Sequence, residues 1–85
     1  MHILIVDDDI KFIDQLKKDF INYFSPQHKE IIFRTISKDF NSINLDKIDI
    51  AFIDIDLKRH NGIDLAIILK KQFPHILIIF IKIQI

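Results

Sequence analysis

Four aspartates stand at the ends of two apolar runs, and their type and spacing make them the residues best suited to chemistry. The triplet Asp7–Asp9 follows the apolar residues Ile3–Val6, and Asp54 ends a second apolar run that begins at Ile50. Clustered carboxylates repel one another unless a cation lies among them or one of them stays protonated. Because carboxylate oxygens are the ligands that Mg²⁺ prefers, we expect a magnesium-type site with one carboxylate left to react.

Two buried strands would have to position these carboxylates. Ile3–Val6 is apolar without alternation, which is typical of a strand covered on both faces, and Ile50–Asp54 is the clearest internal strand of the sequence. Ligands of open parallel sheets bind beyond the carboxyl ends of the strands, where the strand order reverses. If the two strands are neighbours, Asp7, Asp8 and Asp54 project into the same crevice.

The rest of the chain alternates helical and strand patterns. We expect a helix from the N-cap Asp9 to Ser25, a strand over Glu30–Ile36, a short helix over Asp39–Leu45, a well-covered helix over Ile63–Phe73 and a strand over Ile76–Ile81. Asn61-Gly62 reads as a turn. This order predicts an α/β fold: a flavodoxin-like three-layer αβα domain with a parallel sheet in the order 2-1-3-4.

Size and composition exclude several classes of protein. A chain of 85 residues holds one small domain, and 49% hydrophobic with 28% charged residues indicates a globular one. A net charge of zero gives no general attraction to nucleic acid or to an anionic membrane. The longest apolar run, Ile76–Ile81, is too short to span a bilayer, and no signal peptide is visible. The absence of cysteine suits the cytoplasm.

Two segments in register resemble the receiver domain of bacterial response regulators. They are His2–Asp9, HILIVDDD, and Ile48–Asp64, IDIAFIDIDLKRHNGID, and the match LAIILKKQFPHILIIFI extends it to Ile81. The combination is an acidic pair after the first strand, an Asp at the end of the third, and Gly62 eight residues later. The sequence is most similar to receivers that precede LytTR-type DNA-binding domains, although the chain itself holds no DNA-binding element.

The resemblance implies a role in two-component signal transduction and a role for each aspartate. Asp54 corresponds to the phosphoacceptor, which takes a phosphoryl group from a phosphohistidine on a sensor histidine kinase. Asp8 corresponds to the residue that binds Mg²⁺ directly, and Asp7 to its partner, which usually acts through water. Asp56 stands where a backbone carbonyl completes the metal site. Such a domain catalyses only its own phosphorylation and is not an enzyme in the usual sense.

The sequence departs from this family in two places. Lys82 stands at the switch position, where a Ser or Thr is expected. The chain also stops at Ile85, before the family's fifth strand, its last helices and the lysine that contacts the phosphoryl oxygens. We therefore expect residues 1–85 to be a receiver-like domain that is truncated after the fourth strand and impaired in phosphorylation. Ile76–Ile81 would then form an exposed edge through which a homodimer forms, and Lys82 is a candidate substitute for the missing lysine.

Other interpretations stay open. A pseudo-receiver would keep the fold as a protein interaction module without phosphorylation. Asp54-Ile55-Asp56 also resembles the DxD of haloacid-dehalogenase-type, Mg-dependent phosphohydrolases, but that reading leaves Asp7 and Asp8 unexplained. Helix capping alone accounts for at most two of the acids in the triplet Asp7–Asp9.

Overall fold

The computed structural model describes residues 1–24, 30–37, 46–55 and 61–82, and within them strands and helices follow the predicted order. The elements are β1 (His2–Val6), α1 (Ile10–Phe24), β2 (Ile32–Ile36), β3 (Ile50–Asp54), α2 (Gly62–Gln72) and β4 (Leu77–Ile81). The short helix predicted over Asp39–Leu45 lies outside the described residues.

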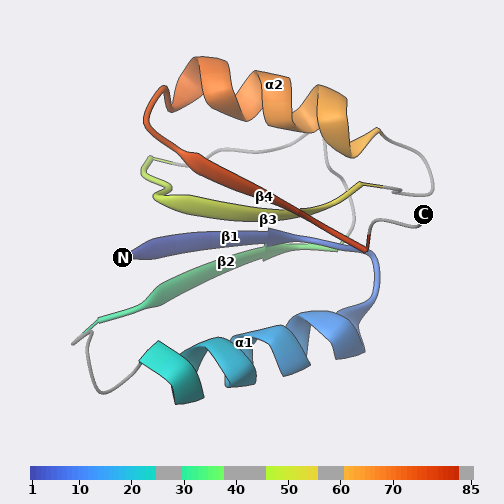
Figure 1. The fold of residues 1–85 in the computed structure, drawn as a ribbon, viewed down its shortest axis with the longest axis vertical. Helices are drawn as coiled ribbons and strands as arrows, with labels where there is room; N and C mark the ends of the chain where they lie inside the picture. The colour runs from blue at the N-terminus through green and yellow to red at the C-terminus, as the bar shows by residue number, and fades with distance from the viewer. Residues whose placement is uncertain (25–29, 38–45, 56–60, 83–85) are drawn as a thin grey trace.

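The four strands form one parallel sheet in the order β2-β1-β3-β4. Helix α2 packs on one face of the sheet and α1 on the other (Figure 1). This arrangement confirms the predicted three-layer fold and its strand order. It also makes β1 and β3 neighbours, with Val6 paired to Ile53, so both strands end at the same edge of the sheet.

Each face of the sheet has a core of its own, which explains the unbroken apolar sequence of β1. Alternate residues of β1 face opposite helices, and none of Ile3–Val6 is exposed to solvent. The core beneath α2 includes Leu4, Val6, Ala51, Ile53, Leu65, Ala66 and Leu69. The core beneath α1 includes Ile3, Ile5, Ile13 and Phe20.

Side-chain caps start both helices. Asp9 Oδ1 accepts a hydrogen bond from the backbone N–H of Phe12 at 3.2 Å, which confirms Asp9 as the N-cap of α1. Asn61 Oδ1 accepts one from the N–H of Ile63 at 2.8 Å and caps α2 in the same way. The prediction of a simple turn at Asn61-Gly62 was therefore incomplete, because Gly62 is already the first residue of the helix.

The prediction that α2 is well covered was wrong. Ile63, Ile67 and Ile68 are all exposed, with Ile67 at 51%. The physical reason is that a helix lying on a sheet buries only one stripe of side chains, whatever the breadth of its apolar sequence.

None of the described helices is long and apolar enough to cross a membrane.

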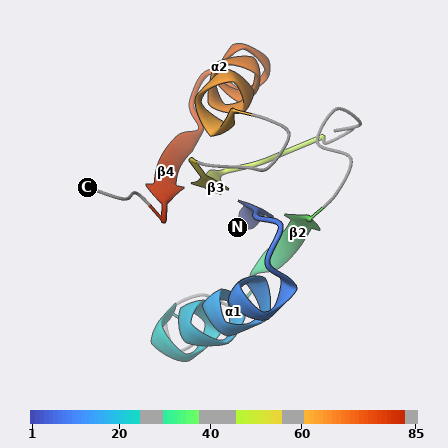
Figure 2. The ribbon, with the colours of Figure 1, turned by 90° about the vertical axis from the view of Figure 1, so that its right-hand side faces the viewer.

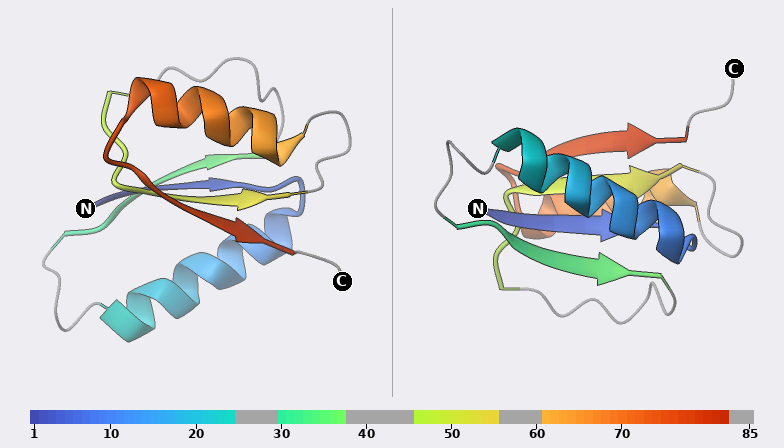
Figure 3. Two further views of the ribbon diagram at one scale, coloured as in Figure 1. Left: turned by 45° about the horizontal axis from the view of Figure 1, so that its top comes forward. Right: turned by 90° about the horizontal axis from the view of Figure 1, so that it is seen from below.

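Helix α1 leaves part of its face of the sheet uncovered near β4. Seen from the helix side, α1 crosses the sheet while β4 extends beyond it (Figure 3, right), and the view along the layers also separates α1 from β4 (Figure 2). An apolar groove of about 530 Å³ lies there, lined in part by Phe20, Phe24, Phe52, Leu77 and Ile79. Leu77 is 55% exposed, and β4 is an edge strand of the described sheet.

Candidate metal and phosphoacceptor site

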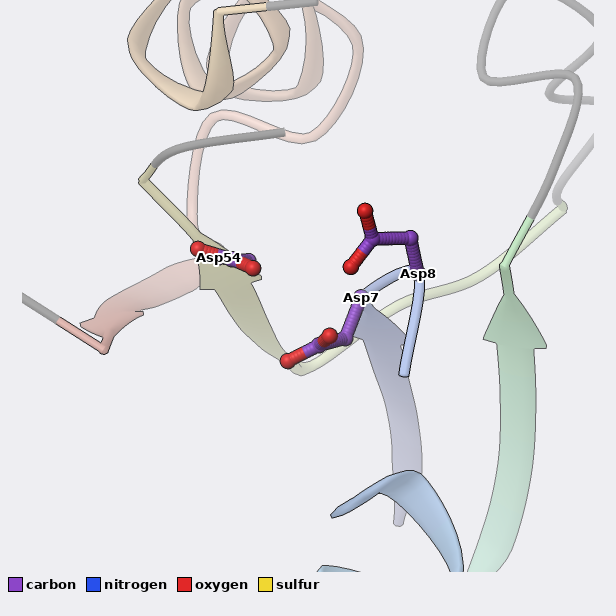
Figure 4. Close-up of side chains that lie close together, drawn as sticks. All are labelled: Asp7, Asp8 and Asp54. Atoms are coloured by element: carbon purple, nitrogen blue, oxygen red, sulfur yellow. The ribbon is translucent and has the colours of Figure 1, made fainter. Parts of the chain in front are cut away.

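Three carboxylates meet beyond the carboxyl ends of β1 and β3. Asp7 and Asp8 come from the turn after β1 and Asp54 from the last position of β3 (Figure 4). One oxygen from each lies within 4.8 Å of the other two. Asp7 is 0% exposed and Asp54 4% exposed, while Asp8 is half-buried. The structure therefore brings together the three carboxylates that the sequence assigns to one crevice.

Hydrogen bonds with neighbouring backbone groups hold Asp7 in place. Its N–H donates to the carbonyl oxygen of Ile36 at the end of β2, at 3.1 Å. Its Oδ1 accepts from the N–H of Asp9 at 2.8 Å. The triplet Asp7–Asp9 is thus divided between two tasks, because Asp9 caps α1 while Asp7 and Asp8 turn toward Asp54.

A fourth charged side chain, that of Lys82, reaches the cluster from the position directly after β4. Asp54 pairs in register with Ile81, so the residue after β4 stands beside the acids. The ammonium of Lys82 lies 2.8 Å from both carboxylate oxygens of Asp7 and donates a hydrogen bond to Oδ1. It also lies 3.9 Å from Asp9 Oδ2 and 4.3 Å from the centre of the Phe12 ring. Among the described residues, the site thus combines three carboxylates with one cation of the protein.

The pKa of Lys82 is raised above its ordinary value by this surrounding negative charge. Burial acts in the opposite direction, because removing the ammonium from water disfavours its charged form. The hydrogen bond to Asp7 and the charges of Asp7, Asp54 and Asp9 together outweigh that effect. Lys82 is therefore a full positive charge at neutral pH.

The geometry of the carboxylate cluster suits a metal ion. Asp7 Oδ2 is buried, and the ammonium of Lys82 is its ion-pair partner at 2.8 Å. Three converging hard oxygen ligands fit a divalent cation of the magnesium type. Asp56, the other predicted ligand, lies outside the described residues.

Two contributors to the site were not assigned a role from the sequence. Gly62 packs against the end of β3, where a Cβ atom would lie 2.3 Å from the carbonyl oxygen of Asp54. The spacing of eight residues between Asp54 and Gly62 was the signal in the sequence for this contact. Phe12 offers its ring to the ammonium of Lys82 across a separation of 70 residues, and no local pattern predicts that contact.

These features define an α/β domain of the flavodoxin-like receiver fold. Among solved structures, the chain is similar to the response regulator DrrB of Thermotoga maritima, an OmpR/PhoB homologue, with a TM-score of 0.64 and 16% sequence identity. The similarity covers 93% of this chain and 34% of that one, so this chain spans about a third of the length of DrrB. Neither a protein-family model nor a curated protein matches the sequence. The likeness to LytTR-associated receivers stays a prediction.

Proposed function

We propose that this chain is a receiver-type domain of two-component signal transduction, which accepts a phosphoryl group on Asp54. One observation carries the proposal: the buried carboxylate of Asp54 lies with those of Asp7 and Asp8 at the carboxyl edge of the sheet. The fold shared with a response regulator supports the same conclusion. The donor would be a phosphohistidine of a sensor histidine kinase, and the role would place the chain in the cytoplasm.

The proposed step is a phosphoryl transfer between two side chains. A carboxylate oxygen of Asp54 attacks the phosphorus atom, the bond from phosphorus to the imidazole nitrogen breaks, and the imidazole leaves with the electron pair. The product is an acyl phosphate on Asp54. Phosphoryl transfer depends mainly on positioning and on charge stabilisation. Helix α2 and the paired strands β3 and β4 hold the backbone of Asp54, which supports its proposed role as the nucleophile.

We assign Asp7, Asp8 and Asp54 as side-chain ligands of Mg²⁺, with the backbone carbonyl of Asp56 as a further ligand. The convergence of one oxygen from each of the three side chains supports this assignment. When bound, the ion would offset the repulsion between the carboxylates and an anionic phosphoryl donor. The domain would be a signalling module that promotes its own phosphorylation and has no separate substrate to turn over.

A pseudo-receiver is the second candidate, and Lys82 is the observation that favours it. The ammonium of Lys82 contacts both carboxylate oxygens of Asp7, at the end of the strand where the family carries a hydroxyl. A receiver in which a lysine forms an ion pair with one of the metal-binding acids would phosphorylate poorly, or would keep only the surface that binds its partners. Lys82 is thus one reason for proposing impaired phosphorylation.

We further propose that the chain forms a homodimer through β4. This strand lies at an edge of the described sheet, and its residues Leu77 and Ile79 are exposed. An apolar edge strand presents backbone N–H and C=O groups that can pair with a second copy of the same strand.

Incubation with acetyl phosphate and Mg²⁺ tests these functions against one another. A hydroxylamine-labile phosphoryl adduct that forms on the wild type and on Asp64→Asn, but not on Asp54→Asn, supports the receiver. Asp64 is an exposed aspartate of α2 and serves as the matched control. Mg²⁺ binding without any adduct supports the pseudo-receiver. Sustained hydrolysis of a phosphomonoester would instead indicate the DxD phosphohydrolase.

A further inference from the structure

Lys82 occupies the same atoms of Asp7 that a metal ion would need. We propose that Lys82 is a tethered counter-cation that competes with the divalent ion for Asp7 and so weakens the affinity of the site for Mg²⁺. This inference rests on the metal site of the proposed function, but it does not depend on phosphorylation.

The contacts of Asp7 carry the proposal. Oδ1 already accepts from the N–H of Asp9 and from Lys82, so Oδ2 is the oxygen left for a metal. The ammonium of Lys82 stands 2.8 Å from that same Oδ2. A metal ion and an ammonium that both contact one carboxylate oxygen lie close together, so their positive charges repel each other strongly. Mg²⁺ binding at Asp7 therefore requires the ammonium to leave Oδ2.

The surroundings of Lys82 provide a second position for the displaced ammonium. The ring of Phe12 and the carboxylate of Asp9 already lie 4.3 and 3.9 Å from it, on the side of α1. An aromatic face and a half-exposed carboxylate both attract an ammonium group. Displacement would thus exchange one set of favourable contacts for another, so the lysine lowers the metal affinity without preventing binding.

The backbone of Lys82 also indicates a specific placement. Its φ angle is 59°, in the left-handed region, which residues other than glycine rarely adopt. Among the described residues, Lys82 is the only non-glycine residue that has a positive φ angle. Outliers of this kind tend to occur where the surrounding contacts hold a functional group in position. Here the contact is the ion pair between Lys82, which follows β4, and Asp7 in the turn after β1.

Calorimetric titration with Mg²⁺ tests the proposal, because it measures binding without any phosphoryl donor. Lys82→Met keeps most of the side-chain length and removes the charge. We expect it to bind Mg²⁺ about tenfold more tightly than the wild type at low ionic strength. Lys71→Met removes an exposed charge from the end of α2 and should change the affinity by less than about twofold.

Lys82→Arg is the control for a change in metal affinity that comes from altered folding and not from the lost charge. It retains the positive charge, and we expect its affinity to stay within about threefold of the wild type. Equal or weaker Mg²⁺ binding by Lys82→Met, or no binding by either protein, would overturn the proposal. If Lys82→Met binds more tightly while none of the variants accepts a phosphoryl group, the counter-cation stands and the proposed receiver function fails.

Discussion

Replacing Gly62 by alanine tests whether the first residue of α2 positions Asp54, the proposed phosphoacceptor. The added Cβ would lie 2.3 Å from the carbonyl oxygen of Asp54, 3.0 Å from Ile55 Cα and 3.2 Å from the carbonyl carbon of Asp54. All three are backbone atoms, so no side-chain rotation relieves the overlap. Either α2 or the end of β3 has to move.

The magnitude follows from two opposing effects. Alanine is favoured over glycine within a helix by about 1 kcal/mol, and somewhat less at the first position of the helix. Overpacking in a well-packed region costs about 1–3 kcal/mol, and contacts with backbone belong at the upper end of that range. We therefore expect Gly62→Ala to lower the free energy of unfolding by about 2 kcal/mol.

Urea denaturation measures this loss, and Mg²⁺ titration reports the displacement of Asp54. The affinity for Mg²⁺ should fall together with stability, because the movement occurs at Asp54, a proposed ligand. Ile67→Ala is the control: this side chain is 51% exposed on the same helix, and its loss should change stability by less than about 1 kcal/mol. A Gly62→Ala protein with wild-type stability and wild-type Mg²⁺ affinity would refute the assigned contact.

Three further predictions concern charge and the edge strand. Asp54→Asn, in the absence of Mg²⁺, should raise the free energy of unfolding by about 1 kcal/mol, because it removes one of three mutually repelling carboxylates. With Mg²⁺ added, urea denaturation should show the wild type to be more stable than Asp54→Asn. A loss of stability of Asp54→Asn without Mg²⁺ would contradict this prediction. The hydrogen bond from His2 N–H at 2.7 Å lowers the pKa of Asp49, against a smaller opposing effect of burial. This stabilisation is present above the unfolded pKa and is lost as the pH falls through the lower folded value. Asp49→Asn should therefore be less stable than the wild type at pH 7, with a gap that closes below about pH 4; a constant gap would count against it. Leu77→Lys should lower the average mass in sedimentation equilibrium if β4 mediates self-association, whereas Ile67→Lys, at a similarly exposed position on α2, should not.

The sheet could be predicted from the sequence because its central strands carry an unambiguous pattern. Ile3–Val6 and Ile50–Ile53 are apolar on both faces, and this requires cover from both sides and a place inside a parallel sheet. Once those strands are neighbours, the carboxylates that follow them must meet. The placement of Asp7, Asp8 and Asp54 therefore followed from local sequence and topology together.

The contacts of Lys82 could not be predicted in the same way. Its position after β4 was apparent, but its ion pair with Asp7 depends on a left-handed backbone angle and on a long side chain crossing the site. Likewise, the apolar breadth of α2 gave no information about which neighbours would cover it, so the exposure of Ile67 was missed. Asn61-Gly62 was read as a turn because such dipeptides commonly occur in turns. Its role depends on a contact with the backbone of Asp54, which only the fold reveals.

The central claim is that Asp54 is the nucleophile of a carboxylate site. Borohydride reduction converts an aspartyl phosphate to homoserine, so peptide mass spectrometry after treatment with acetyl phosphate and Mg²⁺ locates the acceptor directly. We expect homoserine at position 54, dependent on Mg²⁺ and absent when EDTA replaces the metal. Homoserine at another aspartate, or none in folded protein that demonstrably binds Mg²⁺, would contradict the assignment.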